Sequence, residues 1–185
     1  MHVEIIDDTE GRGPATAFPP VENYVDLRED PHAAERIGPA RQYPPLRIFL
    51  SAVNGTDSSF SSASANTQVD SPASASSGED YEFAAQARLV FAEPSFNFER
   101  DRFMDLTAGL KELLEGDSED AIRAVLRISL CDFTAQKRRG FCLSIRLVAH
   151  GISAEQAEMR CGLGLARMQQ ALLFKARALR QQFGA

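Results

Sequence analysis

Two stretches between residues 121 and 150 alternate apolar and polar side chains with a period of two, which restricts the fold more than any other feature. The apolar positions are Leu126, Ile128 and Leu130 in the first stretch, and Phe141, Leu143, Ile145 and Leu147 in the second. A period of two is typical of strands with one buried face and one solvated face. We therefore predict two strands joined by a loop at residues 134–139.

These two strands match each other as a hairpin. A simple register makes five cross-strand pairs, two apolar and three polar: Leu130–Leu143, Ile128–Ile145, Cys131–Cys142, Ser129–Ser144 and Arg127–Arg146. A slip by one residue would bury the arginines, so the core fixes which face is polar. Opposed like charges destabilise a sheet. We therefore expect an anion between Arg127 and Arg146, either an acidic residue of the N-terminal segment or a group of a partner.

The segment before this hairpin has helical spacing. Its apolar residues recur at steps of three and four: Phe103, Leu106, Leu110, Leu113 and Leu114. This spacing places them on one face of a helix. Asn97 is the predicted N-cap, and Gly116 is the predicted stop.

Two further strands are predicted at residues 46–53 and 81–91, where apolar and polar positions also alternate. We expect them to pair as a hairpin. The tract between them, residues 54–80, is crowded with Ser, Ala, Asn, Asp and Gly and is predicted to be a long loop.

The segment after His150 fits two interpretations. In one, a fifth strand at residues 159–165 passes into a terminal helix. In the other, a single helix runs from Ser153 to Gln182, with Ser153 as N-cap and Gln156 completing a capping box. Gly162 and Gly164 would each cost that helix about 1 kcal/mol relative to Ala, which favours the first interpretation.

These elements predict an α+β fold, an antiparallel sheet of about five strands with two helices packed on one face. Residues 46–185 form the expected single domain. Residues 1–45, rich in proline and acidic side chains, are predicted to be an irregular arm, with a short strand at His2–Ile6 as an option.

The composition points away from membranes and from common catalytic chemistry. No run of 18 apolar residues exists and the N-terminal residues do not read as a signal peptide, so we expect a cytoplasmic protein. No nucleophile–base pair can be assembled, so we predict a protein that is not an enzyme and uses no cofactor. The spacing of Cys131, Cys142 and Cys161, all placed on predicted strands, fits no zinc motif. Free thiols are expected, and a redox-sensitive Cys131–Cys142 bridge is the alternative.

Positive charge gathers toward the C-terminus. The chain carries a net charge of −6, yet residues 137–185 sum to +7 and the remainder to −13. The predicted ligand- or partner-binding residues are Arg127 and Arg146 on the polar sheet face and Lys137, Arg138 and Arg139 at the hairpin tip. Two hypotheses follow: a binding protein whose partner is another protein, or a module for nucleic acid or a phosphate-bearing small molecule. Self-association through the C-terminal helix is a further option.

Three stretches have a shared layout with a known group of proteins: F-x-x-D-R-F-x-D-L-x-x-x-L-x-x-L-x-x-G (Phe98 to Gly116), L-R-I-S-L (Leu126 to Leu130) and G-F-C-L-S-I-R-L (Gly140 to Leu147). Completed by a strand that leads into a terminal helix, this order resembles small bacterial immunity proteins of the type that neutralise WapA-like toxins. The resemblance covers residues 46–185 and implies a non-catalytic role in binding a partner.

Overall fold

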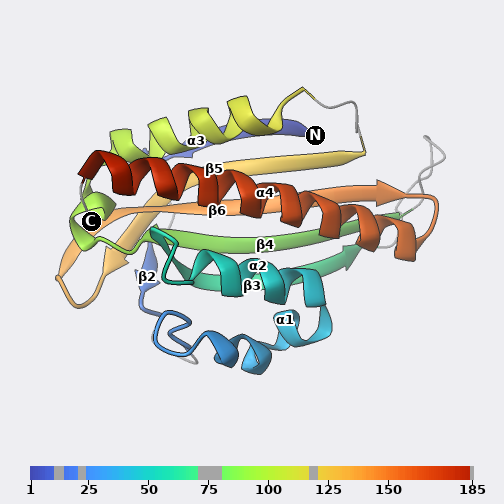
Figure 1. Cartoon of the computed structure of the whole chain (residues 1–185), viewed down its shortest axis with the longest axis horizontal. Coiled ribbons are helices and arrows are strands. Elements are labelled where there is room, and N and C mark those ends of the chain that lie inside the picture. The colour runs from blue at the N-terminus through green and yellow to red at the C-terminus, as the bar shows by residue number, and fades with distance from the viewer. Residues whose placement is uncertain (11–14, 21–23, 71–80, 117–120, 184–185) are drawn as a thin grey trace.

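Six strands form one mixed sheet in a computed structural model that describes residues 1–10, 15–20, 24–70, 81–116 and 121–183. The strands are β1 (His2–Asp8), β2 (Thr16–Phe18), β3 (Phe60–Asp70), β4 (Tyr81–Phe91), β5 (Ile122–Phe133) and β6 (Arg138–Gly151). Their order across the sheet is β1-β5-β6-β4-β3, and β2 pairs with β5 beyond the end of β1 (Figure 1). β1 and β2 run parallel to β5, whereas the other neighbours are antiparallel. The α+β class is as predicted.

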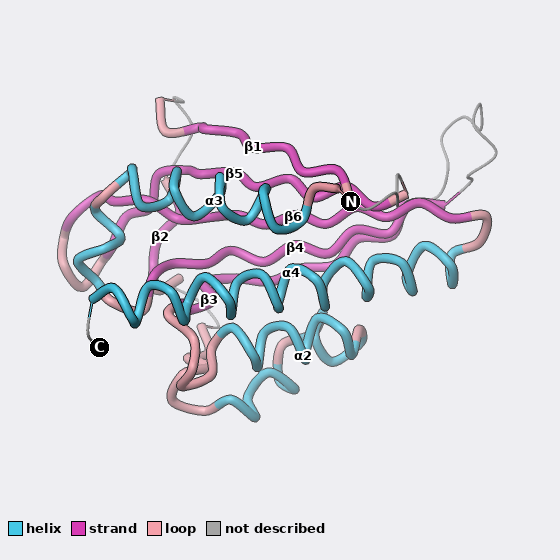
Figure 2. Tube along the Cα trace, turned by 45° about the horizontal axis from the view of Figure 1, so that its top comes forward, coloured by secondary structure: helices cyan, strands magenta, loops and turns pink. Residues whose placement is uncertain are grey.

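The helices form a layer on one face of this sheet. They are η1 (Pro31–Arg36), α1 (Gly38–Gln42), α2 (Pro44–Val53), η2 (Pro94–Phe98), α3 (Arg100–Leu114) and α4 (Ala154–Phe183). α3, α4 and α2 lie side by side across the sheet in both ribbon views (Figures 1 and 2). Between them and the strands lies the main core, which includes Phe49, Phe103, Leu126 and Leu143. No helix in the described part of the chain combines the length and apolar character that a membrane span requires.

The β5–β6 hairpin keeps the predicted faces but not the predicted register. Ile128 lies opposite Leu143 rather than Ile145, and Arg127 lies opposite Ser144 rather than Arg146. The shift is two residues because β6 already begins at Arg138, which shortens the turn to residues 134–137. Since a shift of two preserves the side-chain alternation, Leu143 and Ile145 stay buried as predicted.

The predicted helix is α3, and its apolar face packs in the core as expected. Gly116 follows its C-cap with φ of 129°, a left-handed conformation that favours glycine. The predicted N-cap is wrong, because Glu99 holds that position. Asn97 instead lies in η2, where its buried amide bonds both the N–H and the carbonyl oxygen of Phe91.

Residues 1–45 are not an irregular arm. The optional strand at their start is real and extends to Asp8 as β1, and the segment also contains β2, η1 and α1. Val3, Leu27 and Ala40 are buried in the main core. The proline-rich composition suggested irregular structure, but η1, α1 and α2 each have proline in their first two positions, where a missing N–H costs no hydrogen bond.

Residues 46–53, predicted as a strand, form the helix α2. The segment satisfies both periods, but Leu46, Phe49, Leu50 and Val53 are the buried set, at helical spacing, while Ile48 is 59% exposed. Pro44 and Pro45 at the helix start supply the backbone angles that decide between the two periods. The predicted pairing of this segment with residues 81–91 therefore fails, and β4 instead lies between β3 and β6.

Part of the predicted Ser-rich loop is the edge strand β3, which occupies residues 60–70. Its small side chains pair with β4 through a register shift between Ser62 and Ser64. Residues 71–80 of the predicted loop lie outside the described residues.

The C-terminal segment is one helix, α4, so the predicted fifth strand is wrong and Cys161 lies on a helix. Ser153 caps its start as in the rival interpretation, because Gln156 N–H donates to Ser153 Oγ at 3.2 Å. The predicted capping box is not closed on Ser153, since Gln156 Oε1 accepts from the N–H of Ile152 instead. The two glycines stand where neighbours approach closely. A Cβ on Gly162 would lie 3.2 Å from Tyr43 Oη, and one on Gly164 would lie 3.1 Å from Ile122 Cγ2.

Candidate functional site

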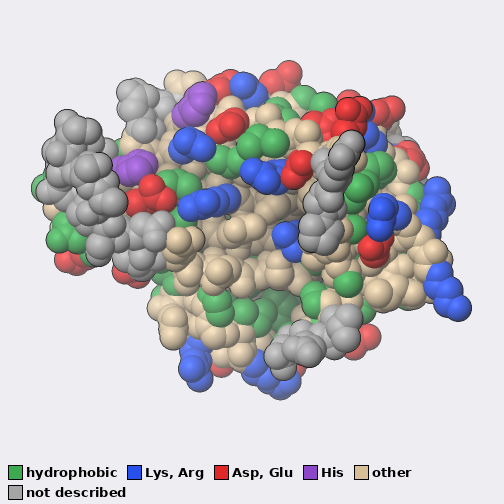
Figure 3. All heavy atoms as spheres, turned by 180° about the vertical axis from the view of Figure 1, so that it is seen from behind, with side chains coloured by type: hydrophobic (Ala, Val, Ile, Leu, Met, Phe, Trp, Pro, Cys, Tyr) green, Lys and Arg blue, Asp and Glu red, His purple; other side chains and the backbone are tan. Residues whose placement is uncertain are grey.

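The sheet face opposite the helices carries a hollow of about 560 Å³. Residues from β1, β4, β5 and β6 line it: Ile6, Glu82, Gln86, Arg88, Arg123, Val125, Arg127, Ser129, Ser144, Arg146, Val148 and His150. Figure 3 shows Lys and Arg side chains across the middle of this face, with Asp and Glu side chains beside them. The hollow is polar because each strand turns its alternate, solvated positions toward it.

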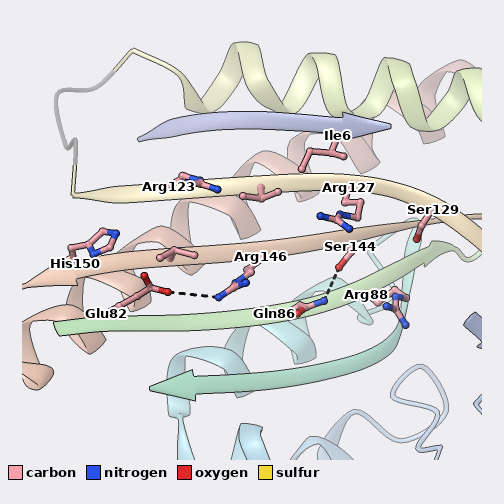
Figure 4. A pocket seen from close by; sticks show the side chains of 12 residues that line it. Ile6, Glu82, Gln86, Arg88, Arg123, Arg127, Ser129, Ser144, Arg146 and His150 are labelled. Carbon is pink, nitrogen blue, oxygen red and sulfur yellow. Dashed lines mark hydrogen bonds and ion pairs between the residues drawn. The ribbon is translucent and has the colours of Figure 1, made fainter. Parts of the chain in front are cut away.

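Four arginines from three strands define the charge of the hollow. Arg123 and Arg127 project from β5, Arg146 from β6 and Arg88 from β4 (Figure 4). The predicted Arg127 and Arg146 are thus on one surface, although as diagonal neighbours rather than an opposed pair. Arg123 was not singled out, although it lies four residues before Arg127, two strand periods away and therefore on the same face of β5. Arg88, on the polar side of the predicted strand at 81–91, was also missed.

Three of these arginines have carboxylate partners within the chain. The N–O distances are 3.2 Å for Arg123–Glu4, 3.5 Å for Arg127–Asp8 and 3.6 Å for Arg146–Glu82. The expected acidic residue from the N-terminal segment is therefore present beside Arg127. All six side chains are partly solvent-exposed, and each pair makes a single contact longer than a charge-assisted hydrogen bond. Such pairs contribute only about 0–1 kcal/mol each.

Arg88 differs from the other three arginines. Its Nε atom is buried and has no hydrogen-bond partner among the described residues. Gln86, two residues earlier on β4, donates to Ser144 Oγ at 2.9 Å (Figure 4). This end of the hollow therefore combines an incompletely bonded guanidinium with neutral hydrogen-bonding groups.

The basic hairpin tip does not join this site. Arg139 donates to both carboxylate oxygens of Asp132, at 2.7 and 3.3 Å, and holds the pKa of Asp132 below its usual value. The Arg138 guanidinium stacks over the Phe98 ring, 4.2 Å from its centroid. Lys137 occupies the turn with a positive φ of 49°. Two of the three predicted cations are thus engaged locally, beyond the end of the hollow.

Two thiols lie just past Ser129, in a small apolar cluster on the same sheet face. Cys131, Cys142, Val90 and Phe133 are buried there. Cys131 lies opposite Gly140 and Cys142 opposite Ser129, so the two cysteines are diagonal neighbours and not the opposed pair predicted. All three cysteines of the chain are free and buried. A hydrogen bond from Cys131, another from Ser129 and the Arg88 charge lower the pKa of Cys142, whereas that of Cys131 is raised.

The two serine hydroxyl groups of the hollow each contact a neighbouring side chain. Ser144 Oγ accepts a hydrogen bond from Gln86, and Ser129 Oγ lies 3.4 Å from Cys142 Sγ. Within the described ranges no cluster of three His, Cys, Asp or Glu side chains could hold a metal ion.

Comparison of the chain with protein-family models, with curated proteins and with solved structures finds no match. The fold and the site together describe an α+β protein with helices on one face of its sheet and an arginine-lined hollow on the other.

Proposed function

We propose that this is a non-enzymatic binding protein of the cytoplasm, and that its partner is another protein that lays an acidic segment in the hollow. The single observation that carries the proposal is the set of arginines on the uncovered face: Arg88, Arg123, Arg127 and Arg146. An immunity-like role, in which the partner is a toxin, is one version of it.

The internal ion pairs leave these arginines able to bind a partner. A guanidinium has five N–H donors, and each internal pair uses one contact at 3.2 Å or more. A carboxylate from a partner can therefore bind the free donors, or displace a weak internal partner at low cost. Planar, bidentate recognition of carboxylates is the geometry for which arginine is suited.

A protein segment fits the hollow better than nucleic acid does. Glu4, Asp8 and Glu82 stand among the arginines, and they would repel a continuous run of phosphates. Two cations of the hairpin tip are held by Asp132 and Phe98. A face of mixed charge instead suits a segment with both acidic and polar side chains, since complementary charge patterns set specificity between proteins.

The proposal also accounts for the shape of the site. The lining residues lie on four neighbouring strands, with His150 at one end of the hollow and Ser129 at the other. Figure 3 shows this face of the sheet exposed to solvent. Small-molecule sites bury most of the ligand surface in a cleft. An open surface along strands suits an extended segment.

The test uses an oligoglutamate peptide and a single-stranded RNA of similar charge as probes, in low salt. The double variant Arg127→Gln/Arg146→Gln should weaken oligoglutamate binding about tenfold, since two partly exposed charge contacts are lost. The charge-matched control Lys137→Gln/Arg138→Gln should bind like the parent. Oligoglutamate binding that is absent, or that survives the Arg127/Arg146 change, contradicts the proposal. RNA binding that is tighter and is lost in the control variant would favour a nucleic-acid module.

A further inference from the structure

The outer side of α4 is unusually apolar. Met159, Leu163 and Phe174 are 61%, 48% and 58% exposed, although the helix also buries Ala157, Met168 and Leu172 in the core. At 3.6 residues per turn these three exposed side chains lie along one stripe, together with the exposed residues Glu155, Ala166, Gln170 and Arg177. Figure 1 shows α4 crossing the front of the molecule with nothing over this side.

The flanking helices also carry exposed apolar side chains. Ile48 of α2 is 59% exposed and Leu113 of α3 is 46% exposed. Among the described residues, five of the six exposed large apolar side chains are therefore on the helix layer; the sixth is Ile152, just before α4. Exposed apolar side chains grouped on one side of a soluble protein mark interaction sites.

The stripe is also polarised in charge. Glu155 lies near the start of α4 and Arg177 near its end, and both are exposed on the same side as Met159 and Phe174. Ala166 lies midway between them. The stripe thus begins with an acidic residue, has a small residue at its centre and finishes with a basic residue.

We propose that this stripe is the interface between two copies of the chain, whose α4 helices pack antiparallel about a two-fold axis at Ala166. The pairing places Met159 of one copy against Phe174 of the other, and Leu163 against Gln170. Glu155 of each copy then meets Arg177 of the other. A two-fold axis makes every contact twice, so a surface must be self-complementary to use it.

The sequence along the stripe selects the antiparallel direction. Positions 155 and 177, 159 and 174, and 163 and 170 are each centred within one residue of Ala166. A parallel pair would instead place Glu155 on Glu155 and Arg177 on Arg177, and like charges opposed in this way are destabilising. The small side chain of Ala166 lets the two helix axes approach at their crossing point.

Disulfide trapping tests the axis. In the Ala166→Cys variant the two introduced thiols meet at the axis, so mild oxidation should give a covalent dimer. In the control variant Gln170→Cys, four residues away on the same stripe, the two thiols lie about 12 Å apart at 1.5 Å per residue, which exceeds the reach of a disulfide. That variant should cross-link at least ten times more slowly. The three native cysteines are buried and do not compete.

Charge reversal with mass measurement in solution tests the pairing without oxidation. Light scattering should report a dimer for the parent chain. Glu155→Arg and Arg177→Glu should each weaken the dimer about tenfold, and the double reversal should restore it. A parent chain that is monomeric at all accessible concentrations, equal cross-linking of both cysteine variants, or failure of the double reversal to restore the dimer would overturn the proposal. These outcomes are independent of the hollow, which lies on the opposite face of the sheet.

Discussion

Asp8 of β1 reaches Arg127 of β5 across the sheet, with 3.5 Å between Asp8 Oδ2 and Arg127 Nη1. Together with Glu82 beside Arg146, it occupies the position that a partner's carboxylate would take. The internal acids are therefore competitors of the proposed ligand. Competition between a ligand and these acids is the property that would distinguish the proposed binding surface from a ladder of purely structural salt bridges.

The first prediction concerns these competitors. The variant Asp8→Asn/Glu82→Gln frees two guanidinium groups, so oligoglutamate should bind roughly two- to fivefold more tightly, the range expected for exposed ion pairs. Asp105→Asn/Glu112→Gln on α3 changes the net charge equally without touching the hollow, and it should leave the affinity nearly unchanged. Calorimetric titration compares the two. Equal tightening in both variants would mean that only the net charge matters.

The second prediction concerns Gly140, which faces the backbone of η2. A Cβ at this position would lie 2.4 Å from the Asn97 carbonyl oxygen. Gly140→Ala should therefore lower the free energy of unfolding by about 1–3 kcal/mol, the usual cost of overpacking. The control is Gly38→Ala, where the added Cβ meets nothing within 4 Å. Urea unfolding measures both, and equal stabilities would show that η2 does not pack against β6 as described.

The third prediction concerns Asn97, whose side chain bonds Phe91 N–H at 2.7 Å and the Phe91 carbonyl at 2.9 Å. Asn97→Ala leaves both buried backbone groups unpaired, so we expect a loss of about 2–4 kcal/mol in the free energy of unfolding. Asn66→Ala, at an exposed site on β3, should cost less than about 0.5 kcal/mol. An Asn97 variant as stable as the Asn66 variant would contradict this bonding.

The fourth prediction concerns alkaline pH. Burial raises the pKa of Cys161 from 9.0 to about 11. The unfolded chain therefore releases this proton at lower pH than the folded chain does, so stability is complete below pH 9 and falls as pH rises from 9 toward 11. In Cys161→Ala the free energy of unfolding should fall less steeply between pH 9 and 10. The comparison stops at pH 10 because burial also raises the pKa of Tyr43, which adds its own loss of stability above that pH. Unfolding curves across this range measure the slope, and an unchanged slope would refute the assignment.

Much of the fold could be predicted because β5, β6, β4 and α3 each have one dominant period. The failures occurred where two periods coincide. Leu46 and Leu50 fit a strand and a helix equally, and the decision came from Pro44 and Pro45. In α4, the apparent alternation from Met159 to Leu165 mixes exposed and buried residues, and Gly162 serves a close approach to Tyr43 rather than breaking the helix.

The candidate site was predictable in part. The alternation of β5 and β6 fixed the face of Arg127 and Arg146, and a register error of two residues left that face unchanged. Their carboxylate partners could not be predicted, because these acids lie on β1 and β4, the neighbours of this hairpin. The alternation within one strand does not indicate which strand lies beside it. The hairpin tip was predicted as a binding site from its number of positive charges alone. That number does not indicate that Asp132 binds Arg139 and that Phe98 stacks under Arg138.

The most direct test of the central claim is a map of backbone amide chemical shifts during titration with oligoglutamate. We predict that the largest changes fall on residues 123–129 of β5 and 144–150 of β6, and that α4 and the hairpin turn at 134–137 stay nearly unchanged. Changes confined to α4 or to the turn, or no change at peptide concentrations that saturate other arginine sites, would contradict the claim that this hollow binds an acidic segment.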